Sequence, residues 1–459
     1  MLTYELKKRP GVPLYEALYR AIRDDILSGR LRPGEKLPGC RTLAEHLEVS
    51  RITVEAAYNQ LLAEGYLRAR ERVGCFVEEV ARLAGPAPAP ARGEEAAEAW
   101  PVDLTGGGLG APFPFSVWMR LQREVMLDYG EKLLAPVQNL GYYPLRQAIS
   151  EHLRGFRGME VRPENILIGA GTDFLYNLLI QLLGRDKLYA LEEPGYGKIR
   201  RIYHCGGVRC VGVGMDSEGI RVEDLGDAQV LHTTPLHHFP TGIVTSQARR
   251  RELLGWVEAR EDRYLIEDDY DSEFRFDSHP VPALCAMSRS GRVIYMNSFS
   301  KTLAPSIRIS YMILPDTLME RFRRELGFYS CTVPSFEQYT LERFLSRGHF
   351  EKHINRMRKF YRGRRNRVLQ ALQECPFAHR LTVLEQDAGL HFLLQVDTDL
   401  SGQALVQRCA GCGIRVQTLA DFYHGHAPAG AEKCLVINYS SLDDSALPAA
   451  LQRLSEGHT

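Results

Sequence analysis

The chain has 459 residues, more than one ordinary hydrophobic core accommodates, so we expect two or three domains. Its 57 basic residues balance 57 acidic ones, which excludes a protein that attracts nucleic acid by net charge, so any DNA-binding surface must be local. We expect no membrane span, because no apolar run is long enough. An apolar run after the first ten residues, as in a secretory signal, is also missing, and we expect a cytoplasmic protein.

The first 80 residues predict three helices and a hairpin. A four-residue spacing of apolar side chains predicts a first helix that Gly29 ends. A short second helix is expected at 41–47, and Ser50 stands where the N-cap of a third helix belongs. That helix runs from 51 to about 64 and closes at Gly65, and two strands follow at 66–71 and 73–79. The residues expected to point inward are Leu14, Leu18, Ile22 and Ile26 of the first helix and Val54, Ala57 and Leu61 of the third.

This order of elements is typical of a DNA-binding helix-turn-helix with a wing. Such a motif presents the N-terminal residues of its second helix to base edges in the major groove. Segment 1–80 has 13 basic against 12 acidic residues, so the prediction depends on placement and not on charge. The predicted base or phosphate contacts are Ser50, Arg51 and Thr53, with phosphate contacts from Arg41, Arg68, Arg70 and Arg72.

The amino-acid sequence of this segment is more specific than the order of its predicted elements. The run LPGCRTLAEHLEVSRITVEAAYNQLLAEGYLRARERVGCFV closely resembles the GntR-type winged helix-turn-helix, and the resemblance covers nearly all of 11–77. Gly39 and Cys40 depart from it, since that family usually has Ser and another polar residue there. The resemblance implies double-stranded operator DNA as a partner.

An Ala/Pro-rich stretch follows, ARLAGPAPAPARGEEAAEAW at 81–100. Alternating proline favours extended polyproline II, so we predict a semi-rigid spacer between a domain at 1–80 and one at 101–459.

The large segment alternates strand-like runs with helical ones, which predicts an α/β fold with a largely parallel sheet. The expected strands are NILIGA, DKLYALE, AQVLHTT, RYLIED, RVIYMNS and ISYMILP. Several end directly in polar residues, and α/β folds place their sites at that edge of the sheet.

The run NSFSKTLAPSIRIS supplies three needs of a pyridoxal phosphate site. Lys301 can form the Schiff base with the cofactor's aldehyde. Ser298 or Ser300, together with Arg308, can hold the dianionic phosphate.

Three further runs fit the same cofactor. In RYLIEDDYDSEF, Asp268 can pair with the pyridinium nitrogen and Tyr270 can bond the ring oxygen; the alternative is an acidic surface loop. In ILIGAGTDFLYN, Gly171 and Thr172 would open a helix whose free N–H groups face the phosphate. In LEEPGYGKIR, Tyr196 could stack on the pyridine ring.

Together and in this order the four runs resemble the fold-type I aminotransferases, from about 104 to 451. With GYYPLRQAI, HHFPTG and the GntR-type head, the chain is similar to the MocR/GabR group of bacterial regulators. That likeness implies a homodimer, the head of one chain lying over the body of the other, in which the cofactor domain senses a small molecule. It also implies cofactor contacts for the residues named in the four runs.

The chain departs from working aminotransferases where they bind the substrate carboxylate. Val436, in CLVINYSSL, stands at the place of their arginine, and Phe239 stands at the place of an asparagine. Lys198 occupies the position of a second arginine in the GABA-responsive member, and we take it as a candidate effector contact. We therefore expect little or no transaminase turnover. The effector could be pyridoxal phosphate, an amine without a conventional carboxylate, or an acid bound through Lys198.

Two other patterns favour a structural interpretation over a functional one. The run RMRKFYRGRRNR at 356–367 has seven basic residues; it could contact nucleic acid, but the face of a solvated helix is favoured. Cys409 and Cys412 have C-x-x-C spacing without a second ligand pair, so we predict no metal site.

The leading hypothesis is a PLP-dependent DNA-binding transcription regulator that senses a small molecule through an aldimine at Lys301. The alternative is an active PLP-dependent aminotransferase with an attached DNA-binding head. A third is a DNA-binding protein whose body binds no cofactor.

Overall fold

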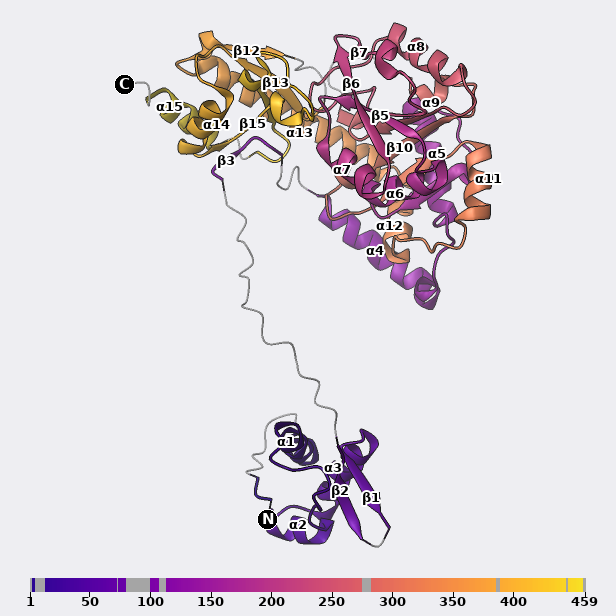
Figure 1. Ribbon diagram of the computed structural model, residues 1–459, viewed down its shortest axis with the longest axis vertical. Coiled ribbons are helices and arrows are strands. Elements are labelled where there is room, and N and C mark those ends of the chain that lie inside the picture. Colours follow the sequence, from indigo (N-terminus) through magenta and orange to yellow (C-terminus); the bar gives the residue numbers. More distant parts are fainter. Residues whose placement is uncertain are drawn as a thin grey trace. The chain divides into compact units, whose positions relative to one another are not determined.

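The computed structural model describes residues 2–4, 13–71, 73–79, 100–106, 113–274, 282–384, 389–442 and 445–456. The chain forms two compact units, Met1–Glu98 and Ala99–Thr459 (Figure 1). The predicted spacer at 81–100 lies outside the described residues except for Trp100, and so does Arg72 of the predicted wing.

The first unit has the predicted three helices and hairpin. They are α1 (Leu14–Ser28), α2 (Cys40–His46), α3 (Arg51–Ala63), β1 (Leu67–Arg70) and β2 (Gly74–Val77). Gly29 ends α1 with a φ of 78°, and the hydroxyl of Ser50 caps α3 by accepting a hydrogen bond from the amide of Thr53. The predicted inward residues of α3 are fully buried, and β1 pairs with β2 in antiparallel register.

The second unit contains an eight-stranded sheet that includes all six predicted strands. Its order is β4 (Ile166–Gly169), β11 (Ser310–Ile313), β10 (Val293–Ser298), β9 (Tyr264–Asp269), β8 (Val230–Thr233), β5 (Leu188–Glu193), β6 (Arg209–Asp216) and β7 (Gly219–Ile220). Strands β5, β6, β8, β9 and β10 are parallel, and β11 runs against its two neighbours. The prediction of a largely parallel α/β sheet is confirmed.

Alternate side chains of the strands enter different cores, as the period of two requires. Ile294 and Met296 of β10 pack in the core that contains α6 (Thr172–Leu183), α7 (Gly197–Cys205) and α11 (Asp316–Glu325). Tyr295, between them, belongs to the opposite core, which α4 (Phe115–Tyr129), α5 (Tyr143–Arg157) and α12 (Ser335–Ser346) complete. Helix α8 (Gln247–Glu258) and the short α9 (Leu284–Met287) enclose a further cluster. Figure 1 shows β5 and β10 inside this shell of helices.

A smaller sheet belongs to the C-terminal part of the same unit. It consists of β12 (Leu381–Leu384), β13 (His391–Val396), β16 (Cys434–Asn438) and β15 (Gln417–Thr418), and β3 (Val102–Asp103) pairs with β14 (Ile414–Arg415). Helices α13 (His349–Glu374), α14 (Gly402–Gly411) and α15 (Leu447–Glu456) accompany it, as Figure 1 shows in yellow and orange. Their shared core is separate from those of the large sheet.

Candidate functional site

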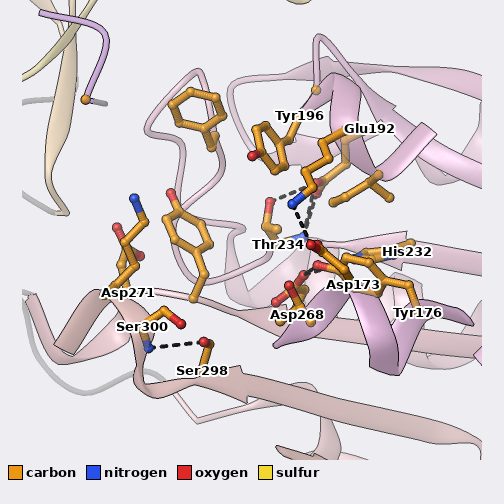
Figure 2. Close-up of a pocket in the computed structure, with 18 of the residues that line it drawn as sticks. Asp173, Tyr176, Glu192, Tyr196, His232, Thr234, Asp268, Asp271, Ser298 and Ser300 are labelled. Atoms are coloured by element: carbon orange, nitrogen blue, oxygen red, sulfur yellow. Dashed lines mark hydrogen bonds and ion pairs between the residues drawn. The ribbon is translucent and has the colours of Figure 1, made fainter. Parts of the chain in front are cut away.

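A cavity of about 350 Å³ lies where the carboxyl ends of several parallel strands meet residues of the small sheet. Eight of the nine predicted cofactor residues line it, and Gly171 directly precedes the lining residue Thr172. They come from distant segments because the parallel strands all end at one edge of the sheet. The eight are Thr172, Tyr196, Asp268, Tyr270, Ser298, Ser300, Lys301 and Arg308 (Figure 2 labels several of them).

Asp268 lies at the end of β9 and is buried, so the alternative of an acidic surface loop is wrong. Its Oδ2 accepts a hydrogen bond from the hydroxyl of Tyr176 and lies 3.3 Å from Nε2 of His232. Oδ1 is buried and has no hydrogen-bond partner among the described residues. A buried carboxylate oxygen without a donor is costly, and one N–H of a bound ring would satisfy it.

Lys301 lies in the short helix α10 (Phe299–Thr302) directly after β10. Its side chain is accessible from the cavity, yet the surrounding protein removes enough water to lower the pKa of its amine, against the opposing charge of Asp271. A lowered pKa leaves more of the amine neutral, and the neutral form is the nucleophile.

An anion cradle forms at the start of α6. Gly171 has a φ of 87°, and a β-carbon there would lie 2.2 Å from a terminal nitrogen of Arg308. Only glycine therefore allows the guanidinium to reach the helix N-terminus, whose free N–H groups attract a phosphate. Arg308 lies 3.5 Å from Asp173, one residue into the helix.

The two serines differ in whether the hydrogen of their hydroxyl group is already donated within the protein. Ser300 donates its hydroxyl hydrogen to the carbonyl of Ile307 at 3.0 Å. Ser298 accepts from the amide of Ser300 and from the hydroxyl of Ser310, and no described acceptor takes its own hydrogen. Between the two, Ser298 has the hydroxyl that can donate to a phosphate.

The two tyrosines lie on the cavity wall. Tyr196 is 52% exposed, and its ring meets that of Phe239 edge-on at 5.9 Å. The Tyr270 hydroxyl lies 3.2 Å from Nδ1 of His237, and burial raises its pKa well above the ordinary value. Tyr270 therefore keeps its proton and can donate it to an oxygen of a bound ring.

The residues at the aminotransferase carboxylate position form an apolar wall. Val436 is buried together with Leu393 and Cys434, and Phe239 and Phe422 pack against them. Lys198 lines the cavity, but its amine forms an ion pair with Asp173 at 2.7 Å. Val436 itself therefore supplies no cation, and the amine of Lys198 is already paired.

The sequence interpretation missed several lining residues. Tyr176 follows Thr172 by four residues on one helix face, a spacing that could have indicated it. His232 lies two residues before the end of a predicted strand, and Asp268 ends another. His391 and Asn438 lie on the small sheet, and no sequence pattern connected them to the cavity.

In the first unit, the predicted DNA contacts gather around the start of α3 and the hairpin. Arg51 is 68% exposed and pairs with Glu55 one turn further on; Arg41 pairs loosely with Glu45. On the hairpin, Arg68 pairs with Glu78, and the guanidinium of Arg70 lies over the Phe76 ring. One residue was missed: Ile52, in the first turn of α3, is 77% exposed.

The residues present fit pyridoxal 5′-phosphate. The unpartnered Oδ1 of Asp268 suits its ring nitrogen, the cradle at Gly171 suits its phosphate, and Lys301 suits its aldehyde. Within the described residues no group of three or more His, Cys, Asp or Glu side chains could hold a metal ion. Cys409 is buried near the end of α14 and Cys412 caps it.

Several side chains of the basic run of α13 form hydrogen bonds within the protein or are buried. Arg358 donates to the carbonyl of Glu273, Arg364 donates to that of Ser440, and Arg365 is buried. No helix within the described part of the chain has the length and apolar character to cross a membrane.

The comparisons with known proteins agree with both units. The model of the bacterial regulatory proteins of the gntR family matches residues 14–77, and that of the class I and II aminotransferases matches 114–454. The HTH-type transcriptional regulator YdeL of Bacillus subtilis is 35% identical over 99% of this chain and 98% of its own length. The probable rhizopine catabolism regulatory protein MocR of Rhizobium meliloti is 33% identical, covering 98% and 94%.

The pyridoxine biosynthesis transcriptional regulator PdxR of Corynebacterium glutamicum is 31% identical over 96% of this chain and 94% of its own. Among solved structures, an archaeal alanine:glyoxylate aminotransferase superposes with a TM-score of 0.69 at 23% identity, covering 79% of this chain and 91% of its own, which shows the fold alone. The chain is a GntR-type DNA-binding domain fused to a fold-type I aminotransferase-like domain. It belongs to the MocR-type family of HTH-type transcription regulators.

Proposed function

We propose that this regulator binds pyridoxal 5′-phosphate at Lys301 and converts a small-molecule signal at that site into a change of affinity for operator DNA. The observation that carries the proposal is the unpartnered Oδ1 of Asp268, in the same cavity as Lys301 and the anion cradle. A protein that had lost its cofactor would have no reason to keep this buried oxygen without a donor.

When bound, pyridoxal 5′-phosphate supplies an aldehyde that bonds reversibly to primary amines, which makes the site a covalent sensor for amines. Asp268 holds a proton at the ring nitrogen, and Tyr270 donates to the ring oxygen. Tyr196 covers one face of the ring. Ser298, Arg308 and the first amides of α6, beginning at Thr172, bind the phosphate.

The first unit supplies the DNA contacts. The start of α3 presents Ser50, Arg51 and Thr53 to the major groove, and the exposed Ile52 suits a thymine methyl group. Arg41, Arg68 and Arg70 contact phosphates around it. The ion pairs of Arg41 and Arg68 are exposed and therefore weak, so DNA phosphates can displace their acidic partners.

The active form is a homodimer. Helix α4 and the turn after it expose a run of large apolar side chains, with Leu127 74% and Leu134 75% exposed. The others are Phe115, Met119 and Met126. Such a face is typical of a subunit interface, and a second copy of this chain is the partner that a two-fold operator requires. We keep the head-over-partner-body arrangement as part of this proposal.

Transaminase turnover would need a group that orients an amino acid for proton removal. Val436 and Phe239 instead form part of an apolar cluster, so a bound amine lacks the two-pronged ion pair that fixes its carboxylate. Binding without efficient turnover is what a sensor requires. The signal shifts DNA affinity through different affinities for two states of the dimer.

Visible absorption of the purified protein with added pyridoxal phosphate tests the cofactor site. We expect a band from the covalent linkage in the wild type and none in Lys301→Ala. Arg289→Ala serves as a matched control. It removes a cation that precedes β10 in the sequence, whereas Lys301 follows that strand, and the variant should keep the band. Equal spectra for wild type and Lys301→Ala would overturn the proposal.

A further inference from the structure

We propose that the effector is a primary amine that carries a hydroxyl group and no carboxylate, and that His391 and Asn438 recognise this hydroxyl. The inference rests on the proposed function, because it names the class of amine that the site at Lys301 senses.

The cavity-facing side of the small sheet has one apolar pair and one polar pair. Leu393 faces Val436 across β13 and β16, and two residues along, His391 faces Asn438. Since side chains alternate along a strand, both pairs lie on the same side of the sheet. The apolar pair is closed off by Phe239, whereas both members of the polar pair line the cavity.

The polar pair offers one acceptor and one donor. His391 is bonded to the carbonyl of Pro240, and because its Nε2 has no partner in the described part of the chain, the bonded nitrogen is Nδ1. Burial and the neighbouring His237 lower the pKa of His391 well below its ordinary value, so the ring is neutral and Nε2 accepts.

Asn438 is oriented by its own strand end. Its Oδ1 accepts from the amide and the hydroxyl of Ser440, at 3.0 and 2.7 Å. Its Nδ2 donates to no described residue, and a β-carbon at Gly106 would lie 2.4 Å from it. A hydroxyl is the simplest group that donates to one partner and accepts from another, whereas a carboxylate cannot donate to Nε2 of His391.

The charges around the cavity also disfavour a carboxylate. The described lining has four carboxylates and four cationic side chains, so their charges cancel. A bound phosphate dianion would therefore make the net charge of the cavity negative, even with a proton on the ring nitrogen. Three of the four cations have acids beside them. Lys198 and Arg308 both pair with Asp173, at 2.7 and 3.5 Å. The β-carbon position of Gly212 lies 1.5 Å from Glu193 and 3.3 Å from Arg200, which makes these two side chains neighbours.

The experiment compares matched ligands that differ only in this group. Wild-type protein loaded with pyridoxal phosphate is titrated with 2-amino-1-propanol and alanine, and with 4-amino-1-butanol and 4-aminobutanoate. Both the visible band and the affinity for operator DNA are measured. We expect each amino alcohol to act at a concentration about tenfold or more below that of its acid.

Two variants locate the recognition. In His391→Leu and Asn438→Ala the preference for the alcohol should fall to about threefold or less, while the band at Lys301 persists and shows that the variants fold. Arg289→Ala, which does not line the cavity, is the matched control and should leave the preference unchanged. A preference that stays about tenfold in both His391→Leu and Asn438→Ala would overturn the assignment.

The outcomes separate this inference from the proposed function. Absence of any visible band contradicts the proposed function itself. A normal band that responds equally to acids and alcohols, or better to acids, overturns only the effector class. It is likewise overturned if no amine acts and pyridoxal phosphate alone changes DNA affinity.

Discussion

The hydroxyl of Tyr176 donates a hydrogen bond to Oδ2 of Asp268, so one oxygen of this buried carboxylate is satisfied, while Oδ1 has no partner among the described residues (Figure 2). The helix α6 thereby fixes the carboxylate that β9 supplies. The same helix begins at the anion cradle, and one helix thus sets the distance between Asp268 and the cradle at Gly171.

Asp268→Asn should weaken binding of pyridoxal phosphate by about 10- to 100-fold, because a charge-assisted hydrogen bond becomes a neutral one. Titration of the apo protein, followed by visible absorption, measures this. Tyr176→Phe should cost less, since it leaves the charge of Asp268 in place. Unchanged affinity in Asp268→Asn would mean that the carboxylate does not face the ring nitrogen.

Gly171→Ala should lower cofactor affinity by about tenfold or more, because the new methyl group displaces Arg308 and the backbone there has positive φ. Gly155→Ala is the control: it lies inside α5, where a β-carbon meets nothing within 4 Å, and we expect full affinity. Equal affinities for the two variants would argue against the cradle.

Arg51→Ala should weaken binding to operator DNA by about 1–3 kcal/mol and reduce discrimination against unrelated DNA, as loss of a base contact does. Fluorescence anisotropy at fixed salt measures both. Arg20→Ala removes an exposed arginine of α1 that pairs with Glu16, and it should bind as the wild type does. If both variants weaken binding equally to any sequence, Arg51 contacts only phosphates.

Glu273 predicts a pH dependence of stability. It is buried, its Oε2 has no partner among the described residues, and burial together with the charge of Asp269 raises its pKa from 4.5 to about 7. Because the folded state holds the proton more tightly, the stabilisation is complete below pH 4.5 and is lost as the pH rises through about 7.

Glu273→Gln, which imitates the protonated acid, should therefore gain stability over the wild type by about 3 kcal/mol between pH 4.5 and 8. Thermal unfolding of both proteins at the two pH values measures the difference. Glu258→Gln, at the exposed end of α8, should follow the wild type. Parallel pH profiles for Glu273→Gln and wild type would contradict this account of the buried acid.

Local patterns were enough to predict the helices and hairpin of the first unit and six of the eight strands of the large sheet. The stripe that includes Leu18 and Ile22, the cap at Ser50 and the apolar strand runs each depend on neighbouring residues, and all appear in the structure. The edge of the sheet that holds the cavity was also predicted, because Asp268 ends one such run and Lys301 follows three residues after another.

The effector side of the cavity could not be predicted in the same way. His391 and Asn438 become neighbours only through the pairing of β13 with β16, which are separated by more than forty residues. The ion pair of Lys198 with Asp173 likewise depends on how α7 packs beside α6. Such relationships arise from tertiary packing and leave no periodic signal in the sequence.

The central claim is that chemistry at Lys301 sets the affinity for DNA. Its most direct test is the Kd for DNA from upstream of the protein's own gene, measured with apo and with cofactor-loaded protein, for the wild type and for Lys301→Ala. We predict that loading the wild type, or adding an amine to the loaded form, changes Kd about fivefold or more and leaves Lys301→Ala unaffected. A Kd that stays the same in all these states of the wild type would contradict the claim.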